Sequence, residues 1–323
     1  MTKVTSIKRF INIVTIRFRL LSLLIALILL FIISSILTPD FLKLNNLINL
    51  LVRTSFLLVL STGMTFIIVG GGIDLSVTSV AVLSHVIIAV ILRDYGMSFV
   101  FTAIAAGLLS GIFVGAINGI VISRLGVNSF IMTMGMMVIT RSVAEILAKG
   151  FVRGVPPAFS KVLSDGKIWI FPVLAVIALS VAFISHLILS YTRIGLQIRG
   201  VGANSNAADY LGISSRNFRL GLFVFSGFLA GITGIMLVGR LGAANPGILV
   251  GFELEAIAAP IIGGATFRGG EGSILGTFIG TIIIGIIANV VILLGVEPYY
   301  QQVVSGLVIL IAVFIAYSGQ RER

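Results

Sequence analysis

Residues 52–92 read VRTSFLLVLSTGMTFIIVGGGIDLSVTSVAVLSHVIIAVIL, two long apolar runs joined by a short glycine-rich break. Each run has about the length that a helix needs to cross a bilayer, which is roughly 20 mainly apolar residues. Glycine lets the chain reverse direction at the break, and Asp74 with Ser76 can cap the start of the second helix. The alternative is that Asp74 and Ser76 belong to the path of a transported substrate.

The composition of the whole chain also indicates a membrane protein. Of the 323 residues, 58% are hydrophobic and only 10% are charged, with a mean hydropathy of +1.19. A soluble domain usually carries about 25% charged residues. Because the apolar runs are long and do not alternate in short segments, they are typical of helices and not of a membrane barrel. The sequence therefore predicts an all-α membrane protein with about ten transmembrane helices.

The predicted spans make residues 1–323 a single transmembrane domain. The eighth is short and contains Gly263 and Gly264, so it either crosses the membrane or re-enters from one side. The net charge of +11 sits in clusters between the runs, which sets orientation and does not indicate nucleic acid. The excess of Lys and Arg in alternate segments places both termini in the cytoplasm, for a multi-pass protein of the bacterial inner membrane. The spans lie near 20–37, 52–70, 76–92, 99–122, 127–148, 170–190, 220–240, 253–267, 274–295 and 300–317.

A weak internal repeat is visible at an offset of 169 residues, the separation of Gly107 from Gly276. Residues 107–111 (GLLSG) correspond to 276–280 (GTFIG), and LGV occurs at both 125–127 and 294–296. The offset maps the fourth span onto the ninth, which comes five spans later. Because five is an odd number of crossings, matching spans run in opposite directions, and the two halves have inverted topology. Inverted repeats are common in transporters. The alternative is chance similarity among Gly, Ile and Leu.

The residues that could carry chemistry are few. The chain has no cysteine and only two histidines, so we expect no metal site, disulfide, cofactor or catalytic group. It has no G-x-x-x-x-G-K-[ST] phosphate loop, so ATP-driven transport needs a nucleotide site on another subunit. Arg141 and Glu145 are four residues apart and can form an ion pair. Side chains that could touch a polar solute are Asp74, Ser76, Asn118 and Asn289, although the two asparagines could equally join helices.

Two further stretches are not plain spans. Residues 200–213 (GVGANSNAADYLGI) lie between apolar spans and suggest a short amphipathic helix in the cytoplasm, with an apolar ridge that binds a partner. The alternative is an ordinary basic loop. Residues 252–273 combine Glu253 and Glu255 with a glycine-dense turn, which favours backbone bending over nucleotide binding.

Together these three stretches resemble the permease subunit of ATP-binding-cassette importers for sugars of the ribose, arabinose and xylose type. The resemblance covers most of the chain, from residues 39–41 (PDF) to residues 301–307 (QQVVSGL). Residues 72–79 (GIDLSVTS) match that group except that Thr78 stands where Gly is usual. In the third stretch Glu255 replaces a usual Asp, and Pro260 is unusual. As a set, the motifs are specific for the group but not for the sugar.

The resemblance implies partners. Two permease chains, as a homodimer or with a sister permease, would form the pathway for a monosaccharide such as ribose. Two cytoplasmic ATPase domains would bind below, and an extracytoplasmic sugar-binding protein would deliver the sugar. Other small solutes of the superfamily (a furanose signal, a nucleoside, a branched-chain amino acid) stay open, as does an ion-driven secondary transporter. The coupling loop to the ATPase would consist of Gly202, Asn204, Ala207, Ala208, Leu211, Gly212 and Ile213.

Overall fold

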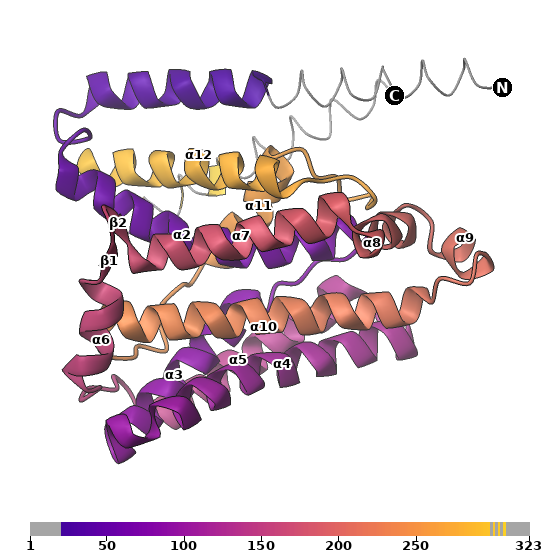
Figure 1. Ribbon diagram of the computed structural model, residues 1–323, viewed down its shortest axis with the longest axis horizontal. Coiled ribbons are helices and arrows are strands. Elements are labelled where there is room, and N and C mark those ends of the chain that lie inside the picture. The colour runs from indigo at the N-terminus through magenta and orange to yellow at the C-terminus, as the bar shows by residue number, and fades with distance from the viewer. Residues whose placement is uncertain (1–20, 298–299, 301–302, 304–305, 308–323) are drawn as a thin grey trace.

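The computed structural model describes residues 21–297, 300, 303 and 306–307, and it consists mainly of long helices (Figure 1). In the described part of the chain, seven helices are long and apolar enough to cross a membrane. The prediction of an all-α membrane protein is thereby confirmed. These helices are α2 (Leu44–Val69), α3 (Val77–Tyr95), α4 (Val100–Leu125, preceded by the 3-10 turn Met97–Phe99), α5 (Ser129–Ala148), α7 (Val173–Tyr191), α10 (Ser215–Leu241) and α12 (Ile274–Leu293).

The first, eighth and tenth predicted spans do not correspond to any of these seven long helices. At the first span the structure has the shorter helix Leu21–Leu37, and residue 20 lies outside the described part. At the eighth it has only α11 (Phe252–Ile262), whose 11 residues reach about 16 Å, or half of the hydrocarbon core. The predicted range 253–267 is thus helical only in its first part, and its crossing of the membrane stays a prediction. The tenth span, 300–317, lies almost wholly outside the described residues.

The long helices run between two ends of the molecule (Figure 1). What we call the α9 end carries α8 (Arg193–Ala203) and α9 (Ser205–Tyr210). The opposite α6 end carries α6 (Pro157–Ser164) and a hairpin of β1 (Lys167–Ile168) and β2 (Phe171–Pro172). The two longest polar stretches of the sequence therefore lie at opposite ends of the helices.

Residues 242–273 connect these two ends although they hold only a short helix. Near the α6 end, Ala244 forms an antiparallel bridge with Val152. Near the α9 end, the backbone N–H of Gly270 donates to the carbonyl of Val69, the last residue of α2. The chain between these points is non-helical over 242–251 and helical in α11. This stretch therefore passes through the molecule as an unwound half followed by a helical half.

The core centres on α10, which packs against α2, α3 and α4. A Cβ atom on Gly111 of α4 would collide with the carbonyl of Gly227 on α10, and a Cβ atom on Gly227 would collide with the carbonyl of Gly111. Small residues allow helix backbones to approach this closely. The glycines of the repeated GLLSG segment thus serve helix packing.

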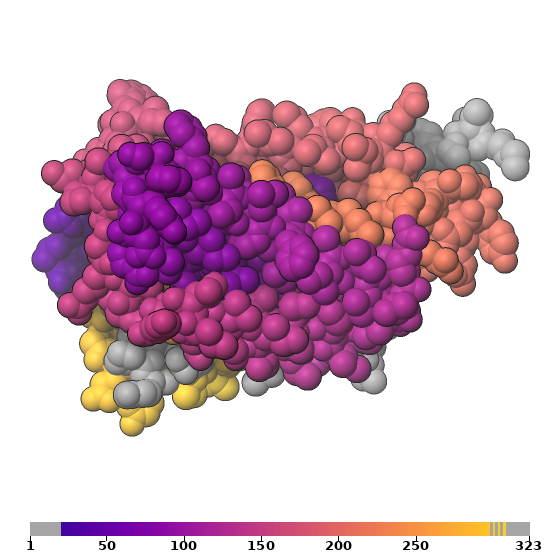
Figure 2. All heavy atoms as spheres, turned by 90° about the horizontal axis from the view of Figure 1, so that it is seen from below, coloured from indigo at the N-terminus to yellow at the C-terminus, as the bar shows by residue number. Residues whose placement is uncertain are grey.

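One face of the molecule is formed largely by α4 and α5, which are purple to magenta in Figure 2. Large apolar side chains lie exposed along both helices, at positions typical of a surface that contacts lipid or another apolar chain. They include Phe101, Phe113, Ile131, Ile139 and Ile146.

Candidate functional site

Polar side chains meet where the break at 70–76 contacts α4 and α10. Asp74 Oδ1 accepts hydrogen bonds from the backbone N–H of Ser76 (2.9 Å) and from its hydroxyl (2.6 Å). Asp74 Oδ2 accepts from the hydroxyl of Ser226 on α10 (3.1 Å). Asn118 of α4 donates to Ser76 Oγ at 2.9 Å, and all four side chains are buried. The structure therefore brings together three of the predicted residues, Asp74, Ser76 and Asn118.

Asn289 lies elsewhere, in a pair of amides. Its Nδ2 donates to Asn46 Oδ1 at 2.9 Å, and Asn46 Nδ2 donates back to Asn289 Oδ1 at 3.0 Å. This pair joins α12 to α2. A reciprocal amide pair satisfies the polar groups that apolar surroundings would otherwise leave unpaired. In this structure Asn289 thus takes the helix-joining role that the sequence left open.

A row of hydroxyl groups on α5 holds the backbone of the same break, which sequence reasoning missed. Ser129 Oγ accepts from the N–H of Ile73 (3.1 Å), and Thr133 Oγ1 accepts from the N–H of Leu75 (3.0 Å). Non-helical backbone at membrane depth persists only where such groups find partners within the protein. The signal in the sequence was the spacing of Ser129 and Thr133, one helical turn apart on an apolar helix.

The second unwound segment, 242–251, is held by charged side chains. Arg141 Nη1 donates to the carbonyls of Pro246 and Ile248, each at 3.3 Å. Among the described residues Arg141 forms no ion pair with Glu145, so the predicted pairing was wrong. The carboxylate of Glu253 accepts from the N–H of Gly251 (3.2 Å) and from the hydroxyl of Thr78 on α3 (2.9 Å).

A small polar cavity of about 210 Å³ lies beside the first break, at the α9 end. The backbone of 70–72 forms one side of it, and the side chains of Asn128, Ser129 and Arg219 supply polar groups. Gly71 has a φ of +82°, so the left-handed turn that shapes this wall favours glycine. Arg219 Nε is buried there without a hydrogen-bond partner among the described atoms.

The predicted coupling motif lies on α8, α9 and the turn that leads into α10. A Cβ atom on Gly202 would collide with the carbonyl of Val69, so α8 packs directly on the end of α2. Asn204 caps α9 by accepting from the N–H of Ala207 (3.0 Å). Gly212 has a φ of +79°, which makes the turn after α9. The short helix expected within this motif is thus present as α9, and its place in the cytoplasm stays a prediction.

The exposed part of this motif differs from the expected ridge. Ala208 is buried, whereas the side chains of Tyr210 and Leu211 are 92% and 79% exposed. Ala207 and Gly212 are exposed, and Ile213 is partly buried. Tyr210 was missed because a tyrosine beside small residues carries no distinct sequence signal.

Asp209 connects α9 to α10. Its carboxylate accepts from the N–H of Ser215 (2.8 Å) and from the hydroxyl of Ser215 (2.7 Å). These hydrogen bonds hold the pKa of Asp209 below its ordinary value. A negative charge at the start of α10 also suits the positive end of the helix dipole. The orientation of α9 relative to the long helix is therefore fixed by a charged contact.

Comparison with known proteins places the chain among transport permeases. The family described as branched-chain amino acid transport system / permease component matches residues 46–313. The ribose import permease of Haemophilus influenzae is 36% identical over 295 residues, covering 90% of both chains. That of Escherichia coli K12 is 36% identical over 305 residues, covering 90% of this chain and 92% of the relative.

A permease for a different sugar is similar to the same degree. The D-allose transport system permease of Escherichia coli K12 is 37% identical over 279 residues, covering 86% of this chain and 85% of the relative. No solved structure matches the chain. Since the family match spans most of the sequence and these relatives align with nearly all of it, the chain belongs to the family of branched-chain amino acid transport system permease components.

Proposed function

We propose that the chain is the membrane-spanning permease subunit of an ATP-binding-cassette importer, and that it forms the pathway for a monosaccharide such as ribose. The observation that carries this proposal is the 36% identity with a ribose import permease over 90% of both chains. The subunit is a multi-pass protein of the inner membrane. Two copies, or one copy and a sister permease, would enclose the pathway. Two ATPase domains would hydrolyse ATP, and an extracytoplasmic binding protein would deliver the sugar.

We further propose that residues 1–323 form one domain of about ten spans in two inverted repeats. At the offset of 169 residues, α2 maps onto α10, α3 maps onto a range that contains α11, and α4 maps onto a range that contains α12. The packing also corresponds, because α3 contacts α4 and α10 just as α11 contacts α12 and α2. An unwound segment precedes both α3 and α11.

In this proposal the α9 end faces the cytoplasm and both termini lie on that side. The support is the positive charge of the segment from Arg193 to Arg219, since basic segments stay inside. The exposed apolar side chains of Tyr210 and Leu211 would then contact the ATPase. Asp209, bonded to Ser215, would transmit a movement of α9 to α10.

The coupling role is tested by Leu211→Ser. We expect less cognate ATPase to co-purify with this variant, while its amount in the membrane stays unchanged. Leu44→Ser is the matched control. Leu44 is also highly exposed, and it begins α2 at the end of that helix far from α8 and α9. Ala208→Arg is a poorer test, since Ala208 is buried and a charge there would disrupt α9 itself. Wild-type co-purification with Leu211→Ser would contradict the coupling assignment.

We propose that the transport path runs beside the first break, near the polar cavity at 70–72. Asp74, Ser76 and Asn118 are bonded to one another and buried, so a solute would meet them only after these bonds open. For Asn289 the same holds, because its amide is occupied by Asn46. In this structure Asp74, Ser76 and Asn118 hold the break against α4 and α10, whereas Asn289 joins α12 to α2.

The function itself is tested by uptake of labelled solutes in a strain that lacks only this chain. Ribose and allose are the sugars named for the relatives reported above, arabinose is named for a permease of Azospirillum brasilense that is 31% identical, and leucine represents the branched-chain amino acids named by the family. We expect uptake of one sugar to be lost and to return with the gene. Unchanged uptake of every solute would refute the proposal. Transport by the purified chain alone in liposomes would instead indicate an ion-driven transporter.

A further inference from the structure

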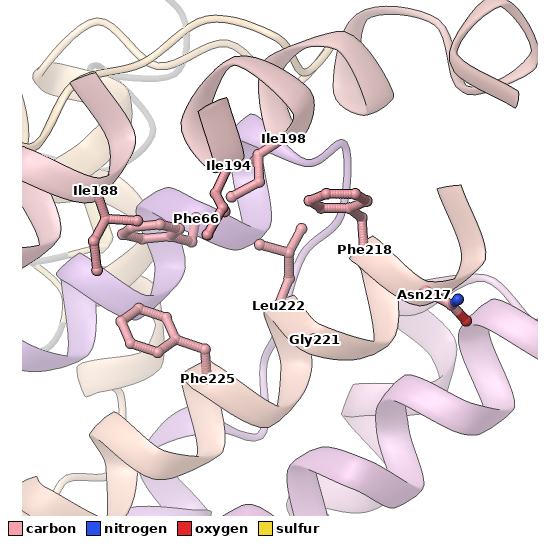
Figure 3. A pocket seen from close by; sticks show the side chains of 9 residues that line it. All are labelled: Phe66, Ile188, Ile194, Ile198, Asn217, Phe218, Gly221, Leu222 and Phe225. Atoms are coloured by element: carbon pink, nitrogen blue, oxygen red, sulfur yellow. The ribbon is translucent and has the colours of Figure 1, made fainter. Parts of the chain in front are cut away.

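An apolar groove of about 390 Å³ lies between α2, α7, α8 and α10 at the α9 end (Figure 3). Figure 3 shows Phe66 from α2 and Ile188 from α7 on one side, with Phe218, Leu222 and Phe225 along α10. Ile194 and Ile198 of α8 lie above them and close the wall at that end. The lining is thus a continuous apolar surface on helices that reach the membrane boundary.

The depth of the groove corresponds to most of one leaflet of a bilayer. Along α10 the lining runs from Asn217 to Phe225, over which the helix rises by about 12 Å. Half of a typical hydrocarbon core is about 15 Å. The groove therefore extends over most of one leaflet, along the direction that an acyl chain of that leaflet takes.

Part of the groove is open space that the described chain does not fill. Gly221 is exposed and faces it from α10, and a Cβ atom built there would find no atom within 4 Å beyond its own stretch of α10. Glycine inside a helix is unfavourable relative to alanine. No close backbone approach, of the kind seen at Gly111, accounts for glycine at this position. An occupant from outside the described chain would use the space.

Two exposed arginines are neighbours of lining residues. Arg124 donates to the side-chain oxygen of Asn217, the polar residue of the lining, at 3.3 Å. Arg193 directly precedes Ile194, and both arginines are exposed. The nearby carboxylate of Asp209 is already bonded to Ser215. An anionic group beside these lining residues would therefore meet cations, and basic pockets of this kind between transmembrane helices bind acidic lipid headgroups.

We propose that this groove is a binding site for an anionic phospholipid of the leaflet at the α9 end. One acyl chain lies along Phe218, Leu222 and Phe225, and the phosphate group lies near Arg124 and Arg193. Because α8 supplies one wall and leads directly into α9, the bound lipid holds α8 against α2 and α10. The inference does not depend on which solute the chain transports.

The acyl-chain part is tested by Gly221→Leu, because a Cβ atom at this lining position meets no atom beyond its own stretch of α10. Native mass spectrometry of the full-length chain would measure retained dioleoylphosphatidylglycerol. We expect retention to fall by at least about tenfold, because the leucine displaces several methylene groups of the lipid. Gly135→Leu is the matched control, since Gly135 is an exposed glycine within α5 and a Cβ atom built there also meets no atom beyond its own stretch of α5.

Unchanged retention in Gly221→Leu would overturn the proposal. So would a change of oligomeric state in the same spectra that Gly135→Leu does not produce, because the groove would then be an interface with a second copy. Equal loss in Gly221→Leu and Gly135→Leu would likewise refute a site at the groove.

The headgroup part is tested by Arg124→Gln and Arg193→Gln, which keep the apolar lining. Each is expected to lower retention of dioleoylphosphatidylglycerol by about fivefold. Retention of dioleoylphosphatidylcholine, which has no net charge, should stay the same. Loss of neither lipid, or equal loss of both, would contradict the assignment of an anionic lipid.

Discussion

Asp74 accepts three hydrogen bonds, two from Ser76 and one from Ser226, while it is buried among apolar helices. A carboxylate in such surroundings is costly unless its oxygens are satisfied. Here they are satisfied by groups from two separate segments. The side chain thereby fastens the break at 70–76 to α10.

We expect Asp74→Asn to destabilise the folded chain by about 1–3 kcal/mol, since its amide would place a donor where the hydroxyl of Ser226 now donates. The measurement is the midpoint of thermal unfolding in detergent. Asp40→Asn is the control, because Asp40 forms only an exposed pair with Lys43, and such pairs contribute little. Equal effects of the two substitutions would show that Asp74 does not hold the break.

Sequence reasoning could single out Asp74, Ser76 and Asn118, because charged and amide groups are rare in spans. It could not separate Asn118 from Asn289, since both lie in glycine-rich spans and only packing decides what each amide meets. Ser226 gave no signal at all. A serine within an apolar helix commonly bonds to its own backbone, and nothing local indicates that it faces a carboxylate 152 residues away.

At the scale of single elements, the link between α9 and α10 depends on the charge of Asp209. Its pKa is lower in the folded chain than the ordinary value of 3.8, because Ser215 donates two hydrogen bonds to the carboxylate. The resulting stabilisation is fully present above the ordinary value, and it is lost as the pH falls through the lower folded pKa.

We therefore expect Asp209→Asn to lower the thermal midpoint slightly near neutral pH. The difference from wild type should shrink once the pH falls below 3.8, where wild-type Asp209 also becomes protonated. Thermal unfolding over a series of pH values measures this. A difference that stays constant over the series would show that the carboxylate charge is not what matters.

The packing of α4 on α10 leads to a prediction about Gly111. Gly111→Leu should destabilise the chain by about 1–3 kcal/mol or more, because the two backbones would have to separate. Gly135→Leu, on the open side of α5, should leave the thermal midpoint nearly unchanged. Similar midpoints for the two variants would mean that the close approach at Gly111 and Gly227 does not limit stability.

The positions of the long helices could be predicted, because the length and the hydropathy of an apolar run are enough to indicate a membrane-spanning helix. The conformation of residues 242–267 could not be predicted by that route. A hydropathy count adds apolar residues whatever their conformation, and it does not detect that Arg141 and Glu253 hold unwound backbone in place. Arg141 lies 105 residues before Pro246 in the sequence. Glu253 is next to the unwound backbone, but its carboxylate is held by Thr78, 175 residues away.

At the scale of the whole molecule, the path of 242–273 decides how the two ends are placed. Because the chain contains no cysteine, single cysteines report each position without background. We expect Lys161→Cys and Asn245→Cys to react with a membrane-impermeant maleimide in intact cells. Ala207→Cys and Arg268→Cys should react only after the cells are opened.

These four positions separate the possible topologies. If Arg268→Cys and Asn245→Cys reacted from the same side, residues 242–273 would not cross the membrane, and the proposed inverted repeat would fail. If each of the four cysteines reacted from the side opposite to the one expected, the orientation of the protein in the membrane would be reversed. Residues 242–273 would still cross the membrane. The wild-type chain, which contains no cysteine, is treated in the same way and controls for reaction at other groups.

The half-helix α11 also has a consequence for the biogenesis of the protein. A segment enters the membrane from the translocon by itself only when its own apolar residues outweigh the cost of its polar backbone. In the unwound residues 242–251, the carbonyls of Pro246 and Ile248 are satisfied by Arg141, and the N–H of Gly251 is satisfied by Glu253. We therefore expect this stretch to enter the bilayer after α5 is in place and together with α12, so that the order of synthesis becomes part of how the chain reaches its fold.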